Sequence, residues 1–307
     1  MSQSDRPVLG VLLMLGFCVL APLGDGFAKY LGATLPLAVL LVARFLMQVI
    51  LLVPITVVRG LHWRYTGRVL WLTVARTVLH ITGIALMFTA LRFMPLAETI
   101  AIAFVMPFIM LLLGKYVLGE TVGPRRLIAC IVGFAGTLMV VQPTFAAVGA
   151  PALLPLGVAL VFALFMLVTR QIAKEVDAIA LQAVSGVIAT VVLVVGLVLW
   201  GADSGQLALV WPPRDTWPWL AGIGVLGTCA HLLMTWSLRF APSATLAPMQ
   251  YLEIPFATLI GWLMFRDLPN GLAAAGILVT VATGLYVVYR EQVTHRRSTL
   301  PADLVDP

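Results

Sequence analysis

The chain has 307 residues, of which 61% are hydrophobic and only 10% are charged. A soluble globular domain carries about 25% charged residues, so this chain cannot cover itself with a polar surface and is expected to be integral to a membrane. Its net charge of +6 does not indicate nucleic-acid binding, because the basic residues stand in short gaps between apolar runs.

The apolar runs predict an all-α integral membrane protein. A helix needs about 20 apolar residues to cross the hydrocarbon. Ten runs are expected to do so: 8–28, 36–57, 69–91, 95–114, 126–142, 152–170, 178–200, 217–238, 242–265 and 270–289. The first run is expected to stay as a helix and not to be removed as a signal peptide.

One uncharged stretch, from Leu127 to Thr169, is too long for a single span. Helix breakers within it are expected to divide it into two helices. These breakers are Pro143, Gly149, Pro151 and Pro155. The remaining loops are mostly short, so neighbouring helices are expected to pack antiparallel, and no separate soluble domain is expected.

The basic residues predict the orientation of the chain. With ten spans, both termini share one side, which collects 13 of the 19 lysines and arginines, whereas the other side collects four. Arg44 and Arg76 make up the rest and lie within spans. The positive-inside rule then places both termini in the cytoplasm.

An internal repeat divides the chain into two halves. The pattern Leu-Arg-Phe-x-Pro-x-Ala begins at Leu91 and again at Leu238, 147 positions later. The shift equals five expected helices, so the second half is expected to be inserted upside down. The boundaries are 1–147 and 148–307. Two inverted halves are typical of secondary transporters, which open a central site to each side in turn.

Two segments carry a resemblance to a known family. "PLAETIAIAFVMPFIMLLLGKYVLGETVGPRRLIACIVGFAGTLMVVQP" (95–143) resembles the repeat unit of the EamA family of the drug/metabolite transporter superfamily, and 237–269 resembles its second copy. Leu118-Gly119-Glu120 is the most recognisable piece, and Arg266-Asp267 replaces Gly119-Glu120 in the second copy. The resemblance implies a ten-helix carrier of small organic solutes in the bacterial inner membrane. Its cavity would lie between helices 1–4 and 6–9, with helices 5 and 10 at the periphery.

The branch of the family that the chain resembles implies a substrate. "GDGFAKYLG" (24–32) and "SLRFAPSATLAPMQYLE" (237–253) resemble riboflavin importers and S-adenosylmethionine uptake carriers. Riboflavin uptake is therefore the first expectation. Export or exchange of amino acids, S-adenosylmethionine or related metabolites is the alternative.

A membrane-embedded lipid-modifying enzyme is the alternative from another class. It would need acid and base groups clustered near one membrane face, whereas the ionisable residues here are spread through several spans. The sequence has no Walker motif, metal cluster or nucleophile elbow, so we expect no enzyme, cofactor or metal site. Transport is then expected to be driven by a gradient, with protons as a candidate coupling ion.

Cys18, Cys130 and Cys229 are expected to be packing residues. A monomer should suffice, and a dimer is compatible.

Glu253 is the first candidate for substrate binding or coupling. It lies in the middle of a span, two residues before Pro255, where the backbone ladder is broken. The structural alternative is a carboxyl group that is protonated or paired with an arginine. Gln250 and Tyr251 lie in the same turn and can add hydrogen bonds or a stacking face.

Three basic candidates lie in the second and third spans. Arg76 and His80 are four residues apart and share a helix face, where histidine can carry a coupling proton and arginine can bind an anion. Alternatively, Arg76 extends to the cytoplasmic end. Arg44 lies too deep for this, so it needs a carboxylate or several carbonyls, and a structural ion pair is the alternative to contact with substrate. The carboxylates considered are Glu253, Glu98 and Asp25.

The remaining candidates have strong structural alternatives. Glu98 follows Pro95 in the first turn of a span, where a carboxylate suits the helix dipole. Asp25 and Lys29 are four residues apart, and a surface ion pair is favoured over a gating role. His231, with Trp236 five residues later, is more typical of a helix-packing hydrogen bond.

Overall fold

A computed structural model describes residues 6–117, 124–200, 205–208, 210–241 and 246–299. Within these ranges all regular secondary structure is helical, which confirms the expected all-α class. Eight helices in the described residues are long and apolar enough to cross a membrane. The Leu118-Gly119-Glu120 motif lies outside the described residues, as does the side chain of Cys130.

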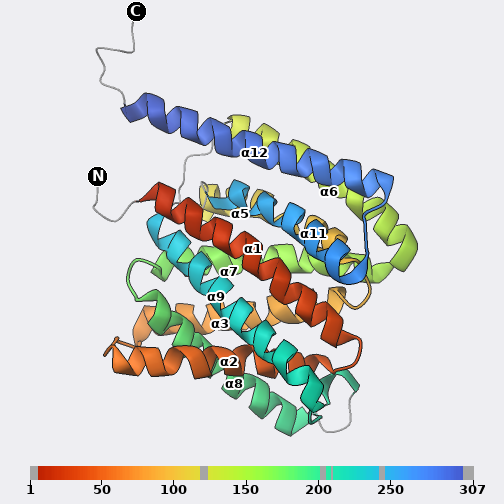
Figure 1. The fold of residues 1–307 in the computed structure, drawn as a ribbon. Helices are drawn as coiled ribbons and strands as arrows, with labels where there is room; N and C mark the ends of the chain where they lie inside the picture. The colour runs from red at the N-terminus through yellow and green to blue at the C-terminus, as the bar shows by residue number, and fades with distance from the viewer. Residues whose placement is uncertain (1–5, 118–123, 201–204, 209, 242–245, 300–307) are drawn as a thin grey trace, which may run out of the picture.

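The helices follow one another along the chain as Figure 1 shows. Their bounds are α1 Pro7–Gly32, α2 Leu37–Val58, α3 Gly67–Ala90, α4 Leu96–Ala103, α5 Met106–Val117, α6 Pro124–Val148, η1 Ala150–Leu153, α7 Leu154–Ile172, α8 Ala178–Trp200, η2 Gly205–Leu207, η3 Arg214–Thr216, α9 Trp217–Phe240, η4 Ala247–Leu252, α11 Glu253–Phe265 and α12 Gly271–Thr299.

The most extensive helix contacts join the two halves of the chain. They pair α1 with α9, α3 with α7, α2 with α8, and α6 with α12. Exchanging the halves converts the α1/α9 pair into α7/α3 and maps the other two pairs onto themselves. In Figure 1, α1 and α7 run in opposite directions. This pairing is what two inverted repeats related by a pseudo-two-fold axis produce.

Two spans that the sequence predicted as single helices are broken. The span at 95–114 divides into α4 and α5, and the span at 242–265 contains η4 followed directly by α11. A proline stands in the first turn of each following helix: Pro107 is the second residue of α5, and Pro255 is the third residue of α11. Proline lacks an amide hydrogen and crowds the carbonyl four residues earlier, so the backbone ladder stops just before it.

The division of the uncharged stretch differs from the prediction in its position. Helix α6 continues through Pro143 to Val148 and ends at Gly149. Gly149 has φ +69°, in the left-handed region that favours glycine, and only then do η1 and α7 begin. The turn therefore depends on the glycine more than on the first proline.

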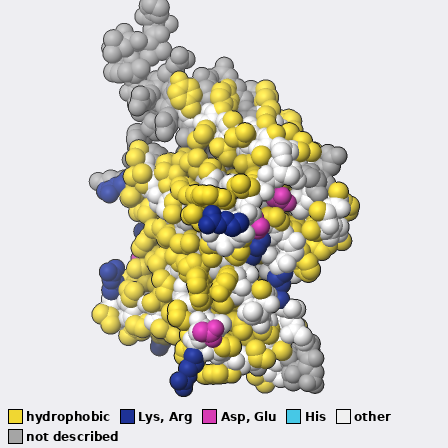
Figure 2. Space-filling view, turned by 45° about the vertical axis from the view of Figure 1, so that its right-hand side comes forward, with side chains coloured by type: hydrophobic (Ala, Val, Ile, Leu, Met, Phe, Trp, Pro, Cys, Tyr) yellow, Lys and Arg dark blue, Asp and Glu magenta, His cyan; other side chains and the backbone are white. Residues whose placement is uncertain are grey.

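The surface of the molecule is apolar. Hydrophobic side chains cover most of the face seen in Figure 2, and charged side chains are few on it. The outer face of α8 alone exposes Val191, Val192, Val195, Val198 and Leu199. A surface of this kind matches lipid tails and not water.

Helices α6 and α12 pack against each other at one edge of the molecule (Figure 1), in the peripheral position that the resemblance implies for helices 5 and 10. Glycines allow the close approach. A methyl group added at Gly276 would lie 2.5 Å from the carbonyl oxygen of Gly136 and 2.9 Å from Cβ of Met139. Small residues at a membrane helix interface let the backbones meet in this way.

We therefore expect Gly276→Ala to lower the thermal unfolding midpoint of the purified protein, because the added methyl group forces α6 and α12 apart at a cost of about 1–3 kcal/mol. Gly196→Ala in α8 is the matched control, since nothing lies within 4 Å of the added atom. Its midpoint should stay the same or rise. Equal losses in the two variants would contradict the close α6–α12 contact.

Candidate substrate-binding cavity

A cavity lies in the middle of the molecule, where the two halves meet. Residues from α1, α2, α3, α4, α5, α7, α9, η4 and α11 line it. Its volume of about 80 Å³ is enough for several water molecules. Most of the lining is apolar. The titratable and amide side chains in it are Asp25, Arg44, His231, Gln250 and Glu253, all of which the sequence singled out.

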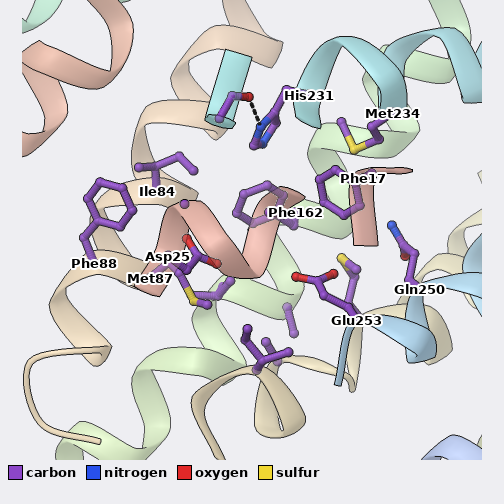
Figure 3. A pocket seen from close by; sticks show the side chains of 18 of the residues that line it. Phe17, Asp25, Ile84, Met87, Phe88, Phe162, His231, Met234, Gln250 and Glu253 are labelled. Carbon is purple, nitrogen blue, oxygen red and sulfur yellow. Dashed lines mark hydrogen bonds between the residues drawn. The ribbon is translucent and has the colours of Figure 1, made fainter. Parts of the chain in front are cut away.

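Two carboxylates stand on one side of this cavity. Asp25 comes from the second half of α1, and Glu253 begins α11 at the helix break. Figure 3 shows both carboxylate groups pointing into the cavity and toward each other, beside the ring of Phe162. Among the described residues, no hydrogen bond or ion pair reaches either of them. Glu253 is nevertheless only 8% exposed.

Arg44 lies on the cavity wall and contacts His231. Its guanidinium donates to Oε1 of Gln48 at 3.0 Å and lies 3.2 Å from Nδ1 of His231. Gly227 leaves the space for it, since a Cβ there would lie 2.1 Å from Nε of Arg44. Among the described residues no ion pair joins Arg44 to a carboxylate, so the alternative of a direct ion pair is wrong. Its hydrogen-bonding contacts are with Gln48 of α2 and His231 of α9.

His231 has two competing hydrogen bonds at one nitrogen. Its Nδ1 lies 3.2 Å from the Arg44 guanidinium and 3.0 Å from the carbonyl oxygen of Gly227, the bond dashed in Figure 3. Arginine only donates and a carbonyl only accepts, so a neutral imidazole cannot satisfy both at once. The ring therefore has two alternative hydrogen-bonding states, one for each tautomer.

Arg76 lies outside the cavity lining and joins three helices of the other half. It is fully buried, so the alternative in which it extends to the cytoplasmic end is wrong. Its guanidinium donates to three hydroxyl groups, one each on α7, α8 and α9: Thr169 at 2.9 Å, Ser185 at 2.7 Å and Thr235 at 3.4 Å. A helix of the first half is thus tied to three helices of the second half.

His80 shares the α3 face of Arg76 and packs inside an aromatic cluster. Its ring lies 4.3 Å from the His231 ring and 4.8 Å from the Phe165 ring, measured between centroids. Neither of its ring nitrogens has a hydrogen-bond partner among the described residues. His80 is separated from the cavity by its neighbours, and His231 is the histidine that lines it.

A polar network connects Arg44 with Arg76 through glutamines that sequence reasoning missed. Nε2 of Gln48 donates to the backbone carbonyl of Gln182 at 2.7 Å, and Nε2 of Gln182 donates to Thr235 at 3.0 Å. These amides are buried within apolar helices, and burial of a polar group requires a partner. Isolated polar residues in the apolar runs were the signal that could have identified them.

Three predicted site residues, Glu98, Tyr251 and Trp236, lie outside the cavity, whereas Gln250 lines it. Glu98 is 8% exposed, accepts a hydrogen bond from Thr144 at 2.7 Å, and joins α4 to α6 outside the cavity. The ring of Tyr251 packs 5.3 Å from that of Phe104, and Trp236 packs on a small cluster around Leu52, so neither lines the cavity. Gln250 does line it, with its amide nitrogen 3.2 Å from Sδ of Met166 and its Oε1 without a partner.

Lys29 closes the end of the molecule opposite the termini. It pairs with Asp267 at 3.1 Å and donates to the backbone carbonyl of Met94 at 2.8 Å. The expected Lys29–Asp25 pair is therefore wrong, because Asp25 turns into the cavity instead. The Lys29–Asp267 contact joins α1 of the first half to the segment after α11 in the second half.

At the other end, Arg68 and Glu175 form an exposed ion pair at 2.7 Å. Exposed pairs of this kind contribute about 0–1 kcal/mol to stability. Tyr65 and Glu175 line a pocket on the surface at this end. Burial, with a smaller effect from Asp177, raises the pKa of Tyr65 to about 12. Its hydroxyl group therefore stays protonated at neutral pH.

Two inverted halves around a central cavity, with a broken helix from each half in its wall, define the class of secondary transporters. The EamA-like transporter family matches the chain at residues 8–142 and again at 150–290. The chain belongs to this family, whose members are transporters and not enzymes.

Curated relatives agree with this class. A riboflavin transporter of Brucella anthropi is 24% identical over 266 residues, covering 85% of this chain and 91% of that protein. A riboflavin transporter of Rhizobium johnstonii is 29% identical, covering 76% of this chain and 74% of its own. An S-adenosylmethionine uptake transporter of Rickettsia prowazekii is 22% identical, and the match covers 92% of this chain and 93% of that protein.

A solved crystal structure has the same fold. It superimposes with a TM-score of 0.67 at 17% sequence identity, and the match covers 95% of this chain and 98% of the other. At this identity the likeness shows the fold alone.

The Arg76 contacts generate a stability prediction. Lysine keeps the charge but loses the planar fork that reaches three hydroxyl groups, so Arg76→Lys should destabilise the protein by about 1.5–3 kcal/mol. Thermal unfolding in detergent measures the loss. Arg64→Lys, at an exposed loop position, is the control and should leave the midpoint unchanged. An unchanged midpoint in Arg76→Lys would contradict the three-helix role.

Proposed function

We propose that the chain is a secondary transporter that moves a small organic metabolite across the bacterial inner membrane by alternating access. The observation that carries the proposal is the central cavity between two inverted halves, with charged side chains in its wall and a helix break from each half beside it. The halves are residues 1–147 and 148–307, with ten spans and both termini in the cytoplasm.

The symmetry of the contacts supports alternating access. Because the halves pair through equivalent helices, exchanging their conformations would open the cavity to the opposite side. The ion pair of Lys29 with Asp267 would break when the end opposite the termini opens. The sequence has no nucleotide-binding loop, so an ion or exchange gradient drives the cycle, with the proton as the first candidate.

Riboflavin is the first substrate to test, because curated relatives that align over most of the chain are riboflavin transporters. A charged metabolite with an amino-acid head group, as S-adenosylmethionine has, is the second. The carboxylates and Arg44 in the cavity favour it, because charged groups of a solute need charged partners in a low-dielectric site. Uptake is the proposed direction, although a pseudopaline exporter of Pseudomonas aeruginosa is also a relative, 25% identical over 277 residues.

Reconstitution into proteoliposomes tests this function. We expect radiolabelled riboflavin or S-adenosylmethionine to accumulate in vesicles that contain the protein, and a pH gradient to increase accumulation if protons are coupled to transport. Protein-free vesicles and excess unlabelled solute are the controls. If the protein accelerates neither uptake nor efflux of flavins, S-adenosylmethionine or amino acids, the proposal is wrong.

The orientation generates a separate prediction. Reporter fusions at Ala147, in the last turn of α6, and at Arg64, between α2 and α3, should read periplasmic and cytoplasmic, respectively, because the predicted spans place these positions on opposite sides and basic residues favour the cytoplasm. Paired alkaline phosphatase and green fluorescent protein fusions measure this. The same side for both positions would refute the five-plus-five inverted arrangement.

A further inference from the structure

The charged side chains that line the central cavity do not balance one another. Asp25 and Glu253 each contribute one negative charge when ionised, and Arg44 contributes one positive charge, so the lining then carries a net charge of −1. Arg76 does not line the cavity. It lies eight residues, ~12 Å along α3, from Ile84, the α3 lining residue nearest to it in sequence.

The oxygens on this side of the cavity also lack partners. The other buried or half-buried carboxylates of the described chain are satisfied: Glu98 by Thr144, Asp267 by Lys29, and Asp177 by the backbone of Ile179. Glu253 is buried without a hydrogen bond and points into the cavity (Figure 3). An unpaired buried carboxylate is unfavourable by several kcal/mol.

From these observations we propose that Asp25 and Glu253 form a binding site for one monovalent cation. The inference deepens the proposed function, because it rests on the central cavity being the substrate site. The ligand chemistry is a single positive charge. Its source is the ammonium or sulfonium group of the transported solute, with free sodium as the alternative source.

The lining favours an organic cation. The rings of Phe17, Phe104 and Phe162 face the cavity together with the methionines Met87, Met106 and Met166. Aromatic faces attract ammonium-type groups through their quadrupole, and this attraction grows when water is excluded. An anionic group on the same solute would meet Arg44, which also lines the cavity, so the site also restricts the orientation of the solute.

Direct binding tests the site without any need for transport. The purified full chain, in detergent at pH 7 and constant ionic strength, is titrated with S-adenosylmethionine, which has a net charge of +1, and with S-adenosylhomocysteine, which lacks the sulfonium methyl group and is neutral overall. Tetramethylammonium chloride and sodium chloride are the further probes. The thermal unfolding midpoint reports binding, because a ligand of the folded state stabilises it.

We expect S-adenosylmethionine to raise the midpoint and S-adenosylhomocysteine to bind at least about tenfold more weakly. Glu253→Gln and Asp25→Asn should each weaken cation binding by about tenfold or more. Glu98→Gln is the matched control, since Glu98 is equally buried but outside the cavity, and it should bind like the wild type. If Glu253→Gln does not fold, Asp25→Asn carries the same test.

The arms of the experiment distinguish the sources. Stabilisation by S-adenosylmethionine or tetramethylammonium assigns the charge to the solute, and stabilisation by sodium alone assigns it to a free ion. The proposal is overturned if no cation stabilises the wild type, or if Glu98→Gln weakens binding as much as the cavity variants. Riboflavin transport without cation binding would contradict the cation site but support the transporter function. Cation binding without any transport would support the cation site but contradict the transporter function.

Discussion

The cost of placing charge in hydrocarbon organises the centre of this protein. Arg44 and Arg76 are both fully buried in predominantly apolar helices, and both donate hydrogen bonds to uncharged side chains. The partners of Arg76 come from three helices of the other half, so its hydrogen bonds form only when the halves meet. Packing of the two halves against each other is therefore required for this buried cation to have hydrogen-bond partners.

The two helix breaks occupy equivalent places but carry different chemistry. Val105 stands two residues before Pro107, and Glu253 stands two residues before Pro255. Symmetry of the fold thus brings two interrupted helices to the cavity, whereas only the second half places a carboxylate at the break. A cavity with an asymmetric set of charged groups can arise in this way from a duplicated and otherwise symmetric scaffold.

The ends of the bundle show a related symmetry. Lys29 in the last turn of α1 donates to the backbone carbonyl of Met94, and Arg170 in the last turn of α7 donates to that of Leu238. Met94 follows α3, the third helix of the first half, and Leu238 lies in the last turn of α9, the third helix of the second half. Each basic side chain therefore contacts the end of the third helix of a half. Lys29 adds a salt bridge to the opposite half, with Asp267. Breaking such contacts alternately is how two inverted halves can change access without unfolding.

The sequence by itself determined the all-helical membrane class, the internal repeat and the residues most costly to bury. Five of its ten candidates meet in one cavity: Asp25, Arg44, His231, Gln250 and Glu253. The tertiary structure decided the partners. Lys29 pairs with a residue 238 positions away instead of its helical neighbour Asp25, and Glu98 accepts a hydrogen bond from α6. Arg76 donates to buried hydroxyl groups instead of extending to the cytoplasmic end. Helical periodicity defines which residues share a face, but which face of a distant helix lies opposite depends on how all the helices pack.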